Sequence, residues 1–160
     1  MFIIEVAIEE AAAITMSTSK KMVITIKVGS NVVTNSKGTL DEDAIINISN
    51  QIKTLRDLGH DVLLISSGAV AAGRSLYQFS KKTDTVAQRQ VLASIGQVKL
   101  ISFYKEVLDK LGILCSQVLV TKEDFKSRNH YLNMQNCLKD FYRITLFLLS
   151  MRMTLSLSRS

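Results

Sequence analysis

The stretch 63–74, Leu-Leu-Ile-Ser-Ser-Gly-Ala-Val-Ala-Ala-Gly-Arg, has the residue types best suited to chemistry. Its apolar run stops abruptly at small and polar residues, a pattern typical of a strand buried on both faces and followed by a loop. In open parallel sheets, ligands bind just beyond the carboxyl ends of the strands. Backbone N–H groups exposed there, especially where a helix begins, suit an anionic group. The loop 66–68 is therefore a candidate anion-binding loop.

A second loop of the same kind, 27–31 (Lys-Val-Gly-Ser-Asn), follows the β-branched run 23–26. Gly29 permits a positive φ and a close approach of the backbone to a ligand. Lys27 stands at the tip of a core strand, where a lysine is costly unless its ammonium reaches solvent or an anion. A lysine that extends its charged end into water is the structural alternative. The candidate chemistry of both loops is the binding of an anionic group.

The elements around these loops form a β-α-β unit. A strand is predicted at 22–28, a helix that opens at Thr39 or Asp41 and ends near Leu58-Gly59, and a strand at 61–65. The helix has one apolar face, formed by Ile45, Ile48, Ile52 and Leu55. Because such a unit is parallel with a right-handed crossover, we expect the two loops at the same edge of the sheet.

The rest of the chain continues the alternation. A long helix is predicted from Asp84 to Leu111-Gly112, with an apolar pattern broad enough for substantial burial and with Gly96 inside it, which indicates close packing. A strand at 113–120, a polar loop at 121–128 and a helix at 129–140 follow. The order predicts an α/β fold, a three-layer α/β/α sandwich with a mainly parallel sheet.

Composition excludes several classes of function. The net charge of +6 is scattered, and neither basic stripes nor aromatic platforms are evident, so nucleic acid is not an expected partner. Cys115 and Cys137 lack metal-ligand or disulfide spacing. No apolar run is long enough for a membrane span and no signal peptide is recognisable, so we expect a cytoplasmic protein without a membrane partner. The P-loop and dinucleotide-binding fingerprints are absent.

Three motifs in order give the chain from Val23 to Asp140 a specific resemblance to the glutamate 5-kinase group of the amino acid kinase family. They are 26–30 (Ile-Lys-Val-Gly-Ser), 64–74 (Ile-Ser-Ser-Gly-Ala-Val-Ala-Ala-Gly-Arg after Leu64) and 88–97 (Gln-Arg-Gln-Val-Leu-Ala-Ser-Ile-Gly-Gln). The resemblance implies an amino-terminal extension at 1–16 and the first part of an amino acid kinase domain at 17–140.

The resemblance also implies an activity and its residues. Such enzymes transfer the γ-phosphoryl group of ATP, with Mg²⁺, to the side-chain carboxylate of L-glutamate in the first step of proline biosynthesis. Lys27 matches the catalytic lysine at the transferring phosphoryl group. Gly29 and Ser30 match the turn beside the ATP phosphates, while Ser67, Gly68 and Ala69 match the glutamate loop. Phosphoryl transfer needs positioning and neutralisation of charge, which these residue types supply. No residue is assigned to a metal, and the family implies a homo-oligomer.

The resemblance stops near Asp140, where the family has a further strand and an Asn-Glu-Asn-Asp loop. Residues 141–154 can be encoded so that skipping two bases gives Leu-Gln-Asn-Asn-Ile-Ile-Pro-Ile-Val-Asn-Glu-Asn-Asp, which is similar to the missing segment. Met151 and Met153 have one codon each, so this encoding is constrained. We therefore expect 141–160 to be an aberrant, frameshifted tail, which sequencing of the coding DNA tests.

With most of the family's ATP site absent, we expect a chain that is poorly stable and catalytically inactive or nearly so. Two alternatives stay open from the sequence. One is another amino acid kinase that acts on a related carboxylate such as acetylglutamate. The other is a non-catalytic chain that only associates with full-length subunits through the helices at 85–110.

Overall fold

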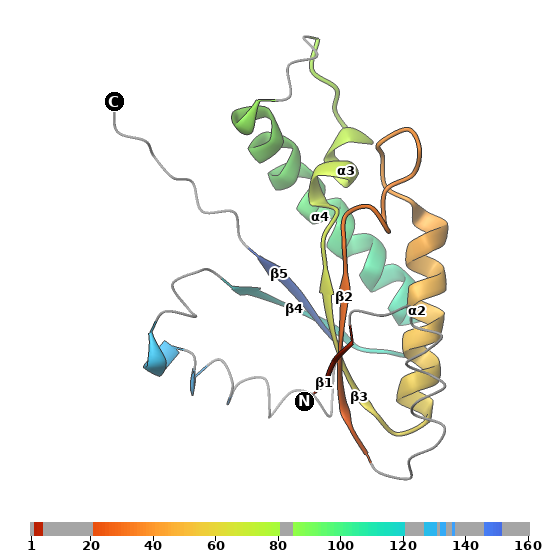
Figure 1. The fold of residues 1–160 in the computed structure, drawn as a ribbon. Helices are drawn as coiled ribbons and strands as arrows, with labels where there is room; N and C mark the ends of the chain where they lie inside the picture. The colour runs from red at the N-terminus through yellow and green to blue at the C-terminus, as the bar shows by residue number, and fades with distance from the viewer. Residues whose placement is uncertain are drawn as a thin grey trace.

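The computed structural model describes residues 2–4, 21–80, 85–120, 127–130, 132–133, 136 and 146–151. Its centre is a five-stranded parallel sheet of order β1-β2-β3-β5-β4 (Figure 1). The strands are β1 (Phe2–Ile4), β2 (Val23–Val28), β3 (Asp61–Ser66), β4 (Cys115–Val120) and β5 (Leu146–Met151). The helices are α2 (Glu42–Asp57), α3 (Ala69–Arg74) and α4 (Val86–Lys110). None of the helices in the described ranges has the length and apolar character that crossing a membrane requires.

The predicted β-α-β unit is confirmed in β2, α2 and β3. The two strands pair in parallel from Val23↔Asp61 to Val28↔Ser66. Of the two candidate caps, Asp41 begins α2, since its Oδ1 accepts a hydrogen bond of 3.0 Å from the Ala44 N–H. Leu58 caps the carboxyl end of the helix, and Gly59 follows with a φ of +88°, as the Leu-Gly signal predicts.

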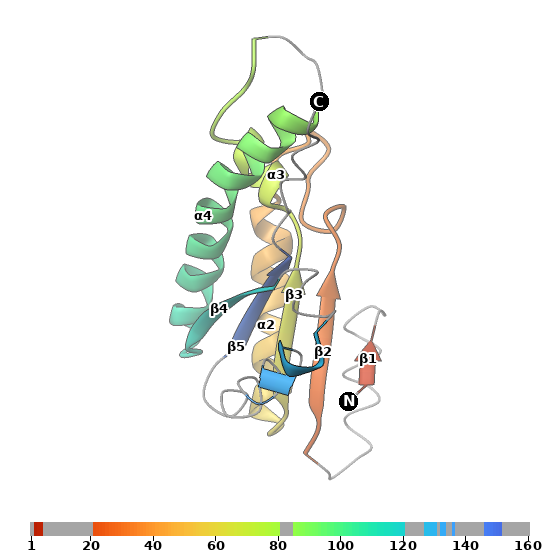
Figure 2. The same ribbon diagram turned by 90° about the vertical axis from the view of Figure 1, so that its left-hand side faces the viewer.

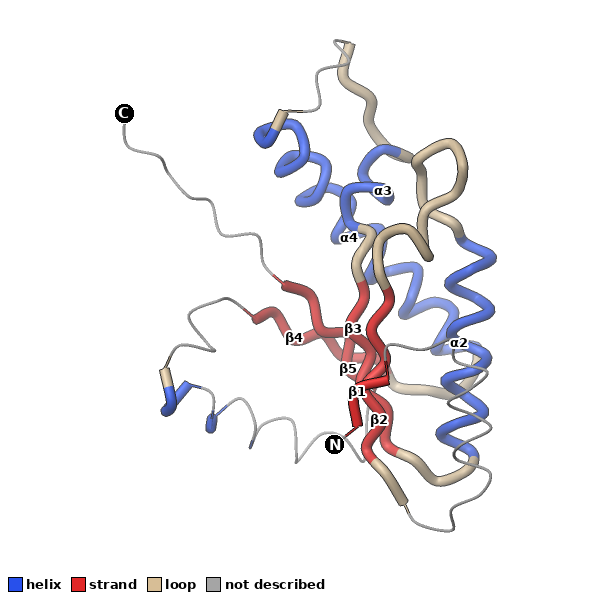
Figure 3. The backbone as a smooth tube through the Cα atoms, viewed as in Figure 1, coloured by secondary structure: helices blue, strands red, loops and turns tan. Residues whose placement is uncertain are grey.

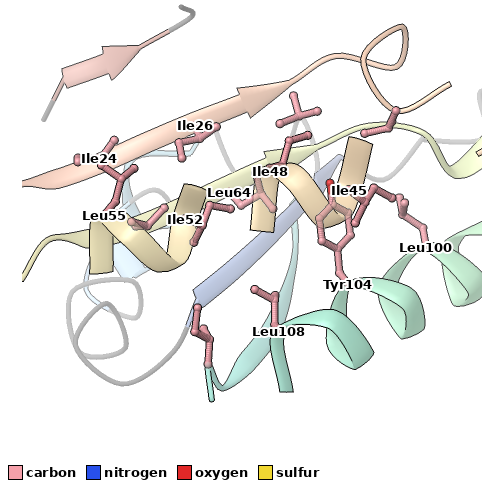
Figure 4. Close-up of a cluster of buried hydrophobic side chains, with 14 of the residues drawn as sticks. Ile24, Ile26, Ile45, Ile48, Ile52, Leu55, Leu64, Leu100, Tyr104 and Leu108 are labelled. Carbon is pink, nitrogen blue, oxygen red and sulfur yellow. The ribbon is translucent and has the colours of Figure 1, made fainter. Parts of the chain in front are cut away.

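The main core lies between the sheet and the helices α2 and α4, which pack on the same face (Figures 2 and 4). Alternate residues of a strand point to opposite faces, and Ile24, Ile26, Val62 and Leu64 point to this one. They meet the buried face of α2 and the residues Leu100, Tyr104 and Leu108 of α4. The α/β class and the parallel sheet are thus confirmed, as an incomplete sandwich in the described part of the chain. The helix predicted at 129–140 lies largely outside the described residues, and the described ones at 128–130, 132–133 and 136 are helical.

The helix α4 differs from its prediction in two respects. It is capped by Thr85, whose side chain accepts from Gln88 N while the Gln88 side chain accepts from Thr85 N, and Asp84 lies outside the described residues. The predicted burial is confirmed for one side of α4, with Leu92, Leu100, Tyr104, Val107 and Leu108, because among the described elements the helix packs with that side only. The residues that remain exposed are Val86, Val91, Ile95 and Val98.

Segments near both ends of the chain join the sheet. Phe2–Ile4, within the extension predicted at 1–16, pair in parallel with Ile24–Ile26 of β2. Leu146–Met151 form β5, which lies between β3 and β4 and pairs with both. This places a strand in the segment after residue 141, where the family resemblance also expects one. The domain limits at 16 and 140 stay a prediction.

Candidate functional site

The two candidate loops leave the same edge of the sheet (Figure 3). Val28 and Ser66 are Cα partners at the carboxyl ends of β2 and β3. One residue later, the backbone N–H of Ser67 donates a hydrogen bond of 3.0 Å to the carbonyl oxygen of Val28. The expectation that the loops 29–31 and 66–68 leave the same edge is therefore confirmed, with a direct bond from Ser67 to the last residue of β2.

The loop after β2 is a turn with an open side. Val32 N donates to the Gly29 carbonyl at 3.1 Å, and Thr34 Oγ1 donates to the Ser30 carbonyl at 2.6 Å. Gly29 and Ser30 are exposed. A Cβ built on Gly29 meets no heavy atom within 4 Å, so packing does not require a glycine at this position. The open space beside the backbone is what a ligand that approaches closely would use.

Lys27 lies on the face of β2 opposite to the core. Its neighbours Ile26 and Val28 are 4% exposed and belong to the core, whereas Lys27 itself is exposed. Its Cα is the partner of that of Ile65, one residue before the paired strand ends. The Lys27 side chain therefore leaves β2 near the sheet edge that carries both loops, on the face opposite to α2 and α4.

Two adjacent serines at the end of β3 differ in their exposure. Ser66 is buried, whereas Ser67 is exposed at the edge of the sheet. Gly68 follows in the left-handed region with φ +119°, and a Cβ built on it would come within 2.6 Å of Val33 Cγ2. A side chain at this position is excluded both by backbone strain and by the packing against Val33. Ala69 then begins α3, a short helix that the sequence did not predict.

A buried hydrogen-bond network lies beneath this loop. Ser66 Oγ donates to the carbonyl oxygen of Ser67 at 3.1 Å and lies 2.9 Å from the hydroxyl oxygen of Tyr104. Tyr104 has no exposed surface, and burial raises the pKa of its hydroxyl to about 12, although the bond to Ser66 acts in the opposite direction. Sequence reasoning missed both residues. The available signal was a phenolic hydroxyl on an otherwise apolar helix face, since a buried tyrosine needs a hydrogen-bond partner.

The helices α3 and α4 cross at two glycines. A Cβ built on Gly73 would lie 2.1 Å from the Leu92 carbonyl oxygen, and one on Gly96 would lie 1.8 Å from the Ala69 carbonyl oxygen. The close packing predicted at Gly96 is confirmed. The backbone of α3, and with it the end of the loop at Ala69, lies directly against α4.

Two residues of types that titrate or bind metals, His60 and Cys115, are buried or partly buried. His60 is 5% exposed, and its Nδ1 accepts a bond of 3.3 Å from Met22 N. Among the described residues Cys115 is a free, partly buried thiol, and burial raises its pKa. Cys137 lies outside the described residues. Within the described ranges, no group of three His, Cys, Asp or Glu side chains is arranged to hold a metal ion.

The sheet edge thus combines one ammonium group, one open glycine and the exposed serines Ser30 and Ser67. A cation and hydrogen-bond donors at a strand end suit a carboxylate or a phosphate group.

Comparison with known proteins shows the family of the chain. Residues 22–144 match the amino acid kinase family. Glutamate 5-kinase of Bacteroides thetaiotaomicron is 49% identical over 115 residues, and that of Chlorobaculum tepidum is 46% identical over 114 residues. These alignments cover 72% and 71% of this chain but 32% of each relative's length. Aspartate kinase from Synechocystis is a solved structure with a TM-score of 0.44 and 13% identity, over 81% of this chain and 21% of that one. On the family match and these relatives, the chain belongs to the amino acid kinase family.

Proposed function

We propose that the chain is the amino-terminal part of a glutamate 5-kinase, which phosphorylates the side-chain carboxylate of L-glutamate with ATP to glutamyl 5-phosphate. The relatives that bear this name span about three times the matched length, so the remaining parts of the reaction belong to segments that this chain does not match. The observation that carries the proposal is the bond between Ser67 N and Val28 O, because it holds the two loops together at one edge.

In this proposal each loop has its own ligand. The residues Ser67, Gly68 and Ala69 hold glutamate, and the exposed Ser67 hydroxyl is available to a carboxylate. Gly29 and Ser30 flank the ATP phosphates, and Lys27 contacts the transferring phosphoryl group. The ammonium group neutralises charge that develops on the phosphoryl oxygens, which is the main task of the protein in such a transfer. Mg²⁺ would enter bound to ATP and would supply further charge neutralisation there.

We also propose the domain limits and the setting. Residues 17–140 form the first part of the kinase domain, 1–16 are an extension, and 141–160 are a frameshifted tail. The protein acts in the cytoplasm, in proline biosynthesis. A single-base insertion or deletion near codon 141 that restores the family sequence would support the frameshift, and an uninterrupted frame would refute it.

The first prediction concerns binding and turnover. Ser67→Ala should weaken L-glutamate binding to the 160-residue chain about 10-fold, since one hydrogen bond to a charged group is lost. Binding is measured by titration calorimetry or NMR. Hydroxamate formation that depends on ATP and glutamate should stay at background for this chain. It should appear in the full-length, frame-restored protein and fall there about 100-fold or more in Lys27→Met.

Gly29→Ala is the matched control for folding. Because no atom lies within 4 Å of the added Cβ and Gly29 has no positive φ, its unfolding midpoint should be no lower than that of the unsubstituted chain, while KM for ATP rises in the full-length protein. Robust turnover by the 160-residue chain would refute the missing ATP site. A preference for acetylglutamate in a panel of acceptors would instead support the alternative substrate.

A second candidate function is association without catalysis. An exposed apolar stripe on α4 favours it, formed by Val91, Ile95 and Val98, which are 45%, 37% and 66% exposed. Their spacings of four and three place them on one face of the helix. Such a stripe suits contact with another subunit, including a second copy of this chain.

This candidate predicts that the tagged chain co-purifies with a full-length kinase subunit. Val98→Lys should abolish co-purification because it places a charge in the stripe. Val86→Lys is the matched control, since Val86 is also 66% exposed but lies on another face of α4. Equal loss in both variants, or a monodisperse monomer in light scattering of the mixture, would contradict association through this face.

A further inference from the structure

Tyr104 connects α4 to the loop that follows β3. Its hydroxyl oxygen lies 2.9 Å from Ser66 Oγ, in a buried position, and the two residues are 38 positions apart in the chain. The ring belongs to the main core and extends from α4 toward the sheet (Figure 4). The Tyr104 ring therefore crosses the apolar core and places its hydroxyl group at the end of β3.

The direction of the hydrogen bonds follows from the number of protons. Ser66 has one hydroxyl proton, and it is donated to the Ser67 carbonyl oxygen at 3.1 Å. Tyr104 must then donate its own proton to Ser66 Oγ. Donors polarise one another in such a chain, so the Tyr104 hydroxyl strengthens the bond that orients the peptide group between Ser67 and Gly68.

That peptide group decides the shape of the loop. Ser67 N is held by Val28 O and Ser67 O by Ser66 Oγ, so both backbone groups of Ser67 are fixed. Gly68 follows with its left-handed φ. At the other end of the loop, Gly96 allows the Ala69 carbonyl to lie against the α4 backbone. The helix α4 thus contacts the loop just before and just after the exposed Ser67.

We propose that Tyr104 is a positioning residue of the substrate loop, which through Ser66 sets the orientation of Ser67 and Gly68. The substrate part of this inference rests on the proposed function. The loop conformation itself does not, since it concerns only the residues of this chain. Tyr104 touches no substrate in this account and acts through Ser66.

The test uses Tyr104→Phe and Ser66→Ala in the 160-residue chain, with Tyr77→Phe as the matched control because Tyr77 is 50% exposed. The amide NMR signals of Ser67, Gly68 and Ala69 should shift in both test variants, further in Ser66→Ala because it also loses the bond to Ser67, and should not shift in the control. The double variant should add nothing to Ser66→Ala, which already removes the bond to Tyr104. Ser66→Thr, which keeps a hydroxyl, should restore the signals. If the chain binds glutamate, its Kd should rise about 5-fold, the equivalent of one ordinary hydrogen bond.

The outcomes separate the two proposals. Unchanged loop signals in Tyr104→Phe, or shifts spread evenly over the core, would overturn the positioning role and leave a packing role. Shifted loop signals in a chain that binds no glutamate would support the positioning role and count against the proposed function. If Tyr104→Phe fails to fold in the 160-residue chain, the same variant in the full-length, frame-restored protein decides the result, since Ser66→Ala removes the bond to Ser67 as well as the bond to Tyr104.

Discussion

Gly96→Ala should lower the free energy of unfolding by about 3 kcal/mol or more. The added Cβ would lie 1.8 Å from the Ala69 carbonyl oxygen and 2.2 Å from Gly73 N. Both are backbone atoms, which cannot turn aside as a flexible side chain can, so α3 must move away from α4. Helix propensity alone predicts the opposite sign, a gain of about 1 kcal/mol for alanine in a helix interior. Urea unfolding followed by circular dichroism measures the difference.

Ser94→Ala is a suitable control because Ser94 is exposed on the same helix, where its hydroxyl donates to the Val91 carbonyl at 2.8 Å. Its effect should stay within about 0.5 kcal/mol. A stabilised Gly96→Ala variant would mean that α3 and α4 do not approach as closely as the structure shows. Because α3 begins directly after the substrate loop, a destabilised variant that still folds should also show shifted Gly68 and Ala69 amide signals.

Ending the chain at residue 145 should separate β4 from the sheet. β5 pairs with β3 from Leu63↔Phe147 to Ile65↔Leu149 and with β4 along its whole length. In the described sheet, β5 is the strand that joins β4 to the others. Without it, both neighbours present unpaired backbone groups, which favour aggregation. We expect hydrogen-exchange protection of the β4 amides to be lost and the soluble fraction to fall.

A chain that ends at residue 151 is the matched control, since it removes residues 152–160 and keeps all of β5. It should retain the β4 protection of the 160-residue chain. Protected β4 amides in the chain that ends at 145 would contradict the sheet order. Loss of protection in both variants would show that residues beyond β5 are required, which the strand pairing alone does not predict.

The local elements could be predicted from the sequence because their signals are local. The Asp41 cap, the apolar spacing from Ile45 to Leu55 and the Gly59 stop all lie within or beside α2. The exposure of Val91, Ile95 and Val98 could not be predicted in this way. Their apolar character is equally typical of a buried helix, and only the arrangement of the neighbours decides which side of α4 is covered.

The contacts between distant segments were the part of the candidate site that was harder to predict from the sequence. That the loops after β2 and β3 share an edge follows from the right-handed β-α-β rule and was predictable. The different positions of Ser66 and Ser67 depend on which face of β3 is covered, and the partner of Ser66 is on a helix far along the chain. The pairing of Phe2–Ile4 with β2 likewise has no local signal. The roles of Lys27, Gly29, Ser30, Ser67, Gly68 and Ala69 stay predictions.

The position of β5 also has a consequence for the order in which the molecule folds. The unit β2-α2-β3 contains its own contacts within a short length of chain and can form while later residues are still being synthesised. β4 cannot pair with the rest of the sheet until residues 146–151 have been synthesised, because β5 lies between β3 and β4 and follows β4 in the chain. Contacts between such distant segments form slowly. During that interval β3 has an open edge, so the arrival of β5 decides how long this edge of the nascent chain is exposed to chaperones, proteases and other copies of itself.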